Sequence, residues 1–162
     1  MGTEGTKQID WYISYFYHIR NMPPTMIPIS TAMWDPGWFH NNKGNDYLFK
    51  DKNGVINGIR CNGLNPHAVY VAGEDCPSGG RKECKLWITG DCKFLPKYKE
   101  YLESLNFKEV INKLESACRR LNPNCTAICL LVYEAFDNPC SEREPLIEWF
   151  NENGKELKLF KG

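Results

Sequence analysis

The sequence predicts an α/β layered fold with a mostly parallel sheet and an irregular cysteine-rich insertion. The first observation is the order of segments, which runs strand, strand, helix, strand, helix, as expected when helices cover a sheet. The second is the apolar run "TAICLLVY" (126–133), which suits a strand buried on both faces, as in parallel sheets. The 162 residues contain no internal repeat, so a single domain spanning 1–162 is expected.

Two strands are predicted in the first part of the chain. "WYISYFYHIR" (11–20) is rich in aromatic and β-branched residues, and "NMPPT" breaks it. "MIPISTAMW" (26–34) follows as a mostly buried strand and ends at the turn "DPGW". Residues 41–92 are rich in turn signals and too long for an ordinary connection, which indicates an insertion with its own organiser or a functional loop.

The second half of the chain contains the clearest helical pattern. Apolar residues follow helical spacing over 96–121, either as one helix or as two helices broken near Asn106, and Pro123 stops the pattern. A further helix is predicted over about 141–151, closed by Gly154. The alternating "ELKLF" (156–160) favours an edge strand.

Composition excludes several classes of function. Lys+Arg and Asp+Glu are balanced at 20 each, so no global field favours nucleic acid, although a local basic patch would still allow it. No apolar run reaches the length of a membrane span, and no secretory signal opens the chain, so a cytoplasmic protein is expected. The G-x-G-x-x-G fingerprint is missing, so nothing indicates a nicotinamide or flavin cofactor, and no P-loop is present.

A candidate site lies at the junction after the apolar run 126–133. Glu134 comes where that strand leaves the core, and Cys140 and Ser141 come where the next helix begins. A helix N-terminus favours an anion and lowers the pKa of a cysteine thiol, while Arg143 could contact phosphate or carboxylate in bidentate fashion. We therefore expect Glu134 and Cys140 to be catalytic and Ser141 and Arg143 to bind ligand.

Each of these residues also has a purely structural interpretation. Ser141 is a common helix cap, and Glu142 is an ordinary first-turn acid that complements the helix dipole. Arg143 could form a salt bridge with Glu134, and Cys140 could be a small buried hydrophobe. From the sequence alone, site and scaffold remain equally open.

The predicted second strand adds further candidates at its carboxyl end. Asp35 could face the same cavity as Glu134, and two carboxylates in one cleft can divide acid and base roles. Trp34 and Trp38 could stack on a base or a sugar, or simply pack in the core. The remaining polar candidates for ligand binding are Ser30 and Thr31.

Three segments together resemble the domain of unknown function 488 (YeaO-like) family. They are "YISYFYHIR", "MIPISTAMWDPGWF" and "LLVYEAFDNPCSER", which are similar to the first strand, the second strand and the closing strand of the family. Glu134, Cys140 and Arg143 correspond in kind to the Glu, Cys and Arg of its closing motif. The Asp-x-Arg of its second strand is replaced here by Ser30, Thr31 and Ala32. The resemblance implies a Rossmann-like architecture with a site at these three residues and an association with bacterial and phage genomes. It implies no settled activity.

Four cysteines in or near the insertion are candidate metal ligands: Cys61, Cys76, Cys84 and Cys92. Without a secretory signal they suggest reduced thiols or metal ligands rather than disulfides, and zinc is expected ahead of an iron–sulfur cluster. No C-x-x-C pair is present, so three reduced thiols in a surface loop remain the alternative.

Three functional hypotheses follow. The first is a domain that binds a nucleotide or a related phosphate- or sugar-containing ligand at 134–143 and hydrolyses it, by nucleotide or glycosidic bond chemistry. The second is a non-enzymatic, metal-stabilised module that contacts nucleic acid or protein. The third is a thiol enzyme that uses Cys140, with His18 as the best candidate base.

Overall fold

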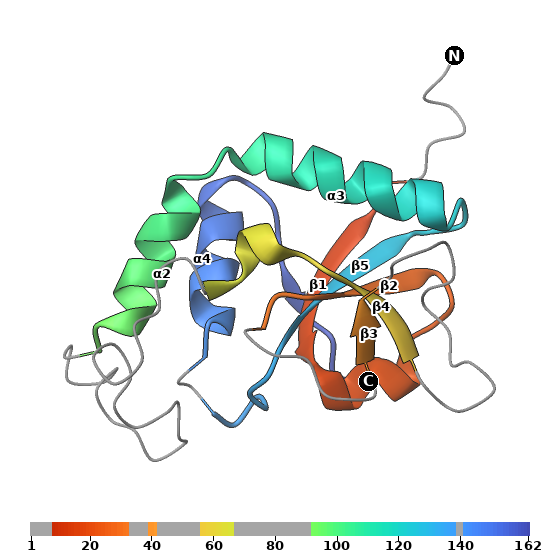
Figure 1. The fold of residues 1–162 in the computed structure, drawn as a ribbon, viewed down its shortest axis with the longest axis horizontal. Coiled ribbons are helices and arrows are strands. Elements are labelled where there is room, and N and C mark those ends of the chain that lie inside the picture. The colour runs from red at the N-terminus through yellow and green to blue at the C-terminus, as the bar shows by residue number, and fades with distance from the viewer. Residues whose placement is uncertain (1–7, 33–38, 42–55, 67–91, 139–140) are drawn as a thin grey trace.

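The protein, described here from a computed structural model, contains one six-stranded sheet in the spatial order β3-β4-β2-β5-β1-β6 (Figure 1). Every strand pairing in it is parallel, which confirms the predicted α/β layered fold. The structure describes residues 8–32, 39–41, 56–66, 92–138 and 141–162. The strands are β1 (Asp10–Tyr15), β2 (Met26–Ser30), β3 (Phe39–Asn41), β4 (Ile56–Arg60), β5 (Ala127–Val132) and β6 (Lys158–Leu159).

Strand β5 forms the centre of the sheet between β1 and β2. Its six residues are all buried, as expected for the apolar sequence AICLLV. Successive side chains point to opposite faces, so Ile128 and Leu130 join one core cluster while Cys129 and Leu131 join the other. The prediction of a strand buried on both faces is confirmed.

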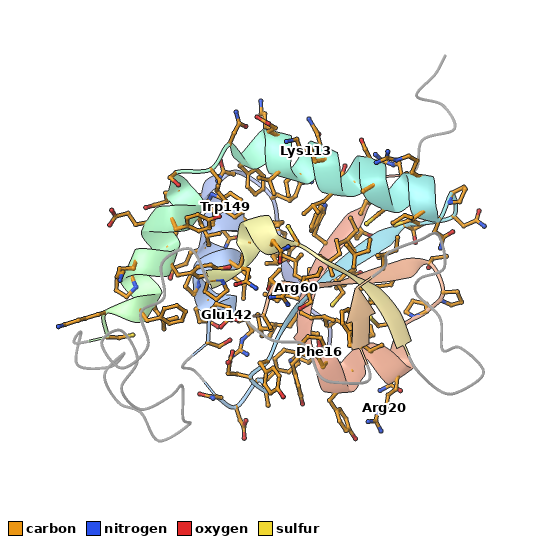
Figure 2. The ribbon with its side chains drawn as sticks, in the orientation of Figure 1. Phe16, Arg20, Arg60, Lys113, Glu142 and Trp149 are labelled. Atoms are coloured by element: carbon orange, nitrogen blue, oxygen red, sulfur yellow. The ribbon has the colours of Figure 1, made fainter. Side chains whose placement is uncertain are left out.

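In the described part of the chain, three α-helices pack against the same face of the sheet. They are α2 (Phe94–Glu103), α3 (Phe107–Leu121) and α4 (Arg143–Glu152). Their buried side chains, including Tyr98, Ile111 and Trp149, share one core cluster with Ile128 and Leu130 of β5. Figure 2 shows Trp149 on α4 between this helix and α3, and its ring lies 4.9 Å from that of Phe107.

The opposite face is covered, in the described part of the chain, by the 3-10 helix η1 (Phe16–Asn21). The predicted first strand, 11–20, is therefore too long at its carboxyl end. Phe16 and Ile19 bury their side chains against Leu131 and its neighbours. A 3-10 helix places residues three apart on the same side, so both side chains can face the sheet. The aromatic and β-branched composition that predicted a strand here serves the core instead.

The helical pattern over 96–121 is split into α2 and α3, which is one of the two predicted alternatives. Asn106 lies between the two helices and is the N-cap of α3. Its side-chain oxygen accepts a hydrogen bond of 3.1 Å from the Glu109 N–H. At the end of α4, Gly154 has a φ of 77° and confirms the predicted C-cap. Strand β6 pairs with β1 at the sheet edge, as predicted for 156–160.

The predicted insertion, 41–92, contributes to the sheet rather than staying wholly irregular. Strand β4 lies within it and pairs with β2, and the short 3-10 helix η2 (Asn62–Leu64) follows. Leu64 is fully buried in the same cluster as the three α-helices. Within the described ranges, no helix has the length and apolar character needed to cross a membrane.

Candidate functional site

The candidate site lies at the edge of the sheet where the parallel strands β2, β4 and β5 end. Of the nine residues predicted for catalysis or ligand binding, five are described: Ser30, Thr31, Glu134, Ser141 and Arg143. The other four, Asp35, Cys140, Trp34 and Trp38, lie outside the described residues. The topology brings the two predicted strand ends together, because β2 and β5 are neighbours in the sheet.

Two carboxyl groups meet at this edge, from Glu134 after β5 and from Glu142 just before α4. Figure 2 shows Glu142 at this position. Glu142 is buried, with a relative exposure of 5%. Burial is the main cause that raises the pKa of Glu142 well above its usual value, and the neighbouring Glu134 carboxylate raises that pKa further. The protonated form of Glu142 is therefore favoured.

The Glu134 carboxylate has a buried oxygen that lacks a partner. Its Oε1 atom has no hydrogen-bond donor in the described part of the protein. The Glu142 and Glu134 side chains are within hydrogen-bonding reach of each other, so a protonated Glu142 can donate to the Glu134 carboxylate. Such a hydrogen bond would offset part of the cost of burying the two groups.

Glu142 is the site residue that the sequence analysis missed. Its position in the sequence indicates only a first-turn acid that complements the helix dipole, which is a surface role. The structure instead places it inside, because α4 begins one residue later, at Arg143, and its first turn faces the sheet. The sequence feature that could have indicated this site is the presence of a glutamate at each end of the strand-to-helix junction, Glu134 and Glu142.

Arg143 organises the loop between β5 and α4. Its Nη1 donates to the carbonyl oxygens of Glu134 (3.4 Å) and Ala135 (3.2 Å), and its Nη2 donates to those of Phe136 (3.4 Å) and Asn138 (2.9 Å). Its Nε lies 3.4 Å from the Glu144 carboxylate. Because four backbone carbonyls and one carboxylate surround its guanidinium, Arg143 holds the loop that begins at Glu134, and the expected bidentate contact with ligand stays a prediction.

Ser141 shapes the first turn of the same segment. Its buried hydroxyl oxygen accepts a hydrogen bond of 3.1 Å from the Arg143 N–H. This is the local capping pattern that favours serine at helix starts. The structural alternative therefore accounts for Ser141, and a contact with ligand stays a prediction.

Ser30 and Thr31 sit at the end of β2, next to Arg60 at the end of β4. The Thr31 hydroxyl donates to the Leu131 carbonyl at 2.9 Å and extends the pairing of β2 with β5. The Arg60 Nη1 donates to Ser30 Oγ at 3.4 Å, and its Nε donates to Asn62 Oδ1 at 3.0 Å. Arg60 is only half buried, and it places a positive charge at the same edge as the carboxyl pair (Figure 2).

Tyr98 of α2 lies on the interior side of the site. Its side chain is fully buried, and its hydroxyl donates a hydrogen bond to the Leu64 carbonyl. Burial is the main cause that raises the pKa of Tyr98, and the nearby Glu142 carboxyl raises it further. A neutral phenol at this position is compatible with a protonated Glu142 and excludes a second buried negative charge.

Half of the metal prediction falls outside the described residues, since Cys76 and Cys84 are among those not described. Cys61 and Cys92 are both half buried and pack against the main core cluster. Burial is the main cause that raises the pKa of the Cys61 thiol, which disfavours the thiolate that zinc would need. Within the described ranges no group of three or more Cys, His, Asp or Glu side chains is placed to hold a metal ion.

Aromatic rings surround the loop that Arg143 holds. The ring centre of Tyr15, at the end of β1, lies 5.1 Å from that of Phe136. The ring centre of Tyr133 lies 6.0 Å from that of Phe16. Tyr133 is 58% exposed although it directly follows the buried strand β5. The sequence analysis did not select these rings, because each is adjacent to an apolar run and could be assigned to the core.

Comparison of the chain with models of protein families, with curated proteins and with solved structures gives no match. The resemblance to the domain of unknown function 488 family therefore stays a prediction. The geometry of the site itself is a pair of neighbouring carboxyl groups, Glu134 and Glu142, at the carboxyl edge of a parallel sheet.

Proposed function

We propose that this protein binds a nucleotide or a related sugar-phosphate ligand and hydrolyses its glycosidic bond, with Glu134 and Glu142 as the acid–base pair. The observation that carries the proposal is the carboxyl pair itself. It lies beyond the carboxyl end of β5, which is where ligands bind in open α/β sheets. A carboxyl group that keeps its proton near neutral pH is suited to general acid catalysis.

The two carboxyl groups are within hydrogen-bonding reach of each other, so we do not place them on opposite sides of a sugar ring. Retaining and inverting glycosidases separate their carboxyl groups by roughly 5 Å or more. A pair that shares a proton acts as one unit instead, as in the carboxyl dyad of aspartic proteases. We therefore assign one general acid, Glu142, and one general base, Glu134, to the same side of the scissile bond.

The proton balance of this step closes within the pair. Glu142 transfers its proton to the leaving base as the bond from the sugar carbon to the base nitrogen breaks. Glu134 takes a proton from the water whose oxygen bonds to that sugar carbon. The pair finishes with one proton, now on Glu134, and its return to Glu142 restores the starting state.

Charge favours the sugar portion of the ligand next to the pair. Two carboxyl groups with one proton carry a net negative charge, which repels phosphate and accepts hydrogen bonds from sugar hydroxyls. We assign the phosphate to the side of Arg60 at the end of β4. The exposed ring of Tyr133, adjacent to Glu134 in sequence, offers a stacking surface for a base.

The test is turnover of a panel of nucleosides and nucleoside 5′-monophosphates, with release of free base followed by chromatography. We expect wild-type protein to release free base. We expect Glu142→Gln to lower the rate of release at least 100-fold, which is the usual contribution of a general acid to the rate. Glu148→Gln is the matched control, because Glu148 is an exposed residue on the same helix whose partner among the described residues is Lys99.

The proposal fails if wild-type protein neither binds nor cleaves any member of the panel, as measured by calorimetry and chromatography. It also fails if Glu142→Gln and Glu134→Gln cleave as fast as Glu148→Gln. Binding by wild type and both variants without cleavage by any of them would replace the hydrolase with a binding protein.

A further inference from the structure

His18 lies in η1, just beyond the carboxyl end of β1, and its ring is largely buried. Its Nδ1 lies 2.9 Å from Ser14 Oγ and 3.0 Å from the carbonyl oxygen of Phe160. The Ser14 hydroxyl donates to the same carbonyl at 2.7 Å. The C-terminal segment thus reaches back across the chain and fixes one side of the imidazole.

These contacts determine which ring nitrogen carries the proton. A carbonyl oxygen only accepts, so a nitrogen at 3.0 Å from it must donate. The Ser14 hydroxyl proton is already directed at the same carbonyl, so its oxygen is left to accept from Nδ1. In the neutral ring Nδ1 therefore bears the hydrogen, and Nε2 carries the free lone pair.

No protein donor takes up that lone pair within the described part of the chain, where every hydrogen bond of His18 is made by Nδ1. The ring packs 4.6 Å from Tyr15 and 5.4 Å from Phe136, between ring centres. Phe136 belongs to the loop that begins with Glu134 and is held by Arg143. His18 therefore packs against the loop that follows Glu134.

We propose that His18 contributes a neutral Nε2 base to this site, held in its tautomer by Ser14 and the Phe160 carbonyl, which accepts a hydrogen bond from a base N–H or a sugar hydroxyl of the ligand. The inference rests on the proposed function for the ligand class. It adds a contact residue from η1 and gives the C-terminal segment a role in positioning that residue.

The first experiment needs no ligand. Long-range ¹H–¹⁵N NMR of uniformly labelled protein reports the tautomer of each histidine, and we expect the Nδ1–H form for His18. Diethyl pyrocarbonate, which acylates an unprotonated imidazole nitrogen, should then modify His18 at Nε2, and peptide mapping separates it from His40 and His67. An Nε2–H tautomer, or a His18 that resists the reagent in folded protein but reacts after unfolding, overturns the proposal.

The second experiment separates positioning from structure. His18→Asn keeps an N–H donor near the Nδ1 position for the Phe160 carbonyl but removes Nε2, whereas His18→Gln removes the donor at Nδ1. We expect His18→Asn to unfold at the same urea concentration as wild type and to bind adenosine 5′-monophosphate at least tenfold more weakly. Wild-type affinity in a folded His18→Asn overturns the contact.

The two proposals fail in different ways. If no nucleotide binds wild-type protein but the tautomer and the acylation are as expected, the proposed function fails. The assignment of an accessible, unprotonated Nε2 to His18 then still holds. If nucleotides bind and Glu142→Gln abolishes cleavage, but addition of adenosine 5′-monophosphate leaves the His18 Nε2 resonance unmoved, the inference about His18 fails alone.

Discussion

At the scale of single residues, Glu142 is a carboxyl group placed where water cannot solvate its charge. Its burial, together with Glu134, keeps the proton on in the folded protein, while the unfolded chain releases it above the ordinary carboxyl pKa of about 4.5. The folded state thus binds more protons than the unfolded state as pH rises past that value. The free energy of unfolding must fall with rising pH until the raised pKa is passed.

This linkage gives a first prediction for Glu142→Gln. The amide is neutral at every pH, so the variant should lose this part of the pH dependence and be more stable than wild type at neutral and alkaline pH. Urea unfolding at pH 5, 7 and 9 measures the difference. Equal slopes of stability against pH in wild type and variant would contradict the assignment, and Glu148→Gln should behave as wild type.

Arg143 gives a second prediction, because its guanidinium serves four carbonyl oxygens at once. Lysine offers three donors from a single point and cannot span them. We expect Arg143→Lys to lower the free energy of unfolding by about 2–3 kcal/mol, the cost of leaving buried polar groups unsatisfied. Arg120→Lys, at an exposed position of α3, is the matched control and should change it by less than about 0.5 kcal/mol.

Hydrogen exchange tests the mechanism behind that loss. If Arg143 holds the loop, amide exchange should speed up over 134–138 in Arg143→Lys and stay unchanged in β5. Uniform acceleration across the sheet would mean that Arg143 supports the global fold and does not specifically position Glu134.

At the scale of elements, the start of α3 depends on one side chain. Asn106 caps the helix through the Glu109 N–H, and it also marks the break from α2. We predict that Asn106→Ala lowers the free energy of unfolding by about 1 kcal/mol. Asn112→Ala, at an exposed position inside the same helix, should be neutral or stabilising, since alanine is the better helix former. An equal loss in both variants would argue against the cap.

The elements that the sequence predicted well are those with a strong local pattern. The continuous apolar run of β5 and the helical spacing of α3 each admit one interpretation, and both are confirmed. The end of β1 was misjudged because aromatic residues favour strands in general, while here Phe16 and Ile19 fill a face that no α-helix covers in the described chain. Strand β4 was missed, since INGIR contains a glycine and few apolar residues.

At the scale of the whole molecule, the site depends on contacts that are distant in sequence. The junction of Glu134 with α4 could be located because it is local, and the general position beyond a central strand follows from the fold class. The burial of Glu142 could not be predicted, because it requires Tyr98 and β5 to enclose the first turn of α4. The bond between His18 and Phe160 joins residues 142 positions apart and leaves no trace in local sequence.

The metal prediction also belongs to this scale, because its ligands would come from Cys61, Cys92 and a segment outside the described residues. If zinc organises 41–92, elemental analysis of protein purified without added metal should give about one zinc per chain. Removal of zinc by a chelator should then lower the melting temperature. A metal-free protein with an unchanged melting temperature would contradict this prediction and leave the carboxyl site unaffected.

The central claim is that Glu134 and Glu142 share a proton at the carboxyl edge of the sheet. ¹³C NMR titration of the glutamate side-chain carboxyl groups tests it directly, in wild type and in Glu134→Gln. We predict that Glu142 titrates well above the ordinary carboxyl range in wild type, and that its pKa falls but stays raised in Glu134→Gln, because burial remains. A Glu142 that titrates in the ordinary range, or that is unchanged by Glu134→Gln, would contradict the shared proton and the acid–base pair built on it.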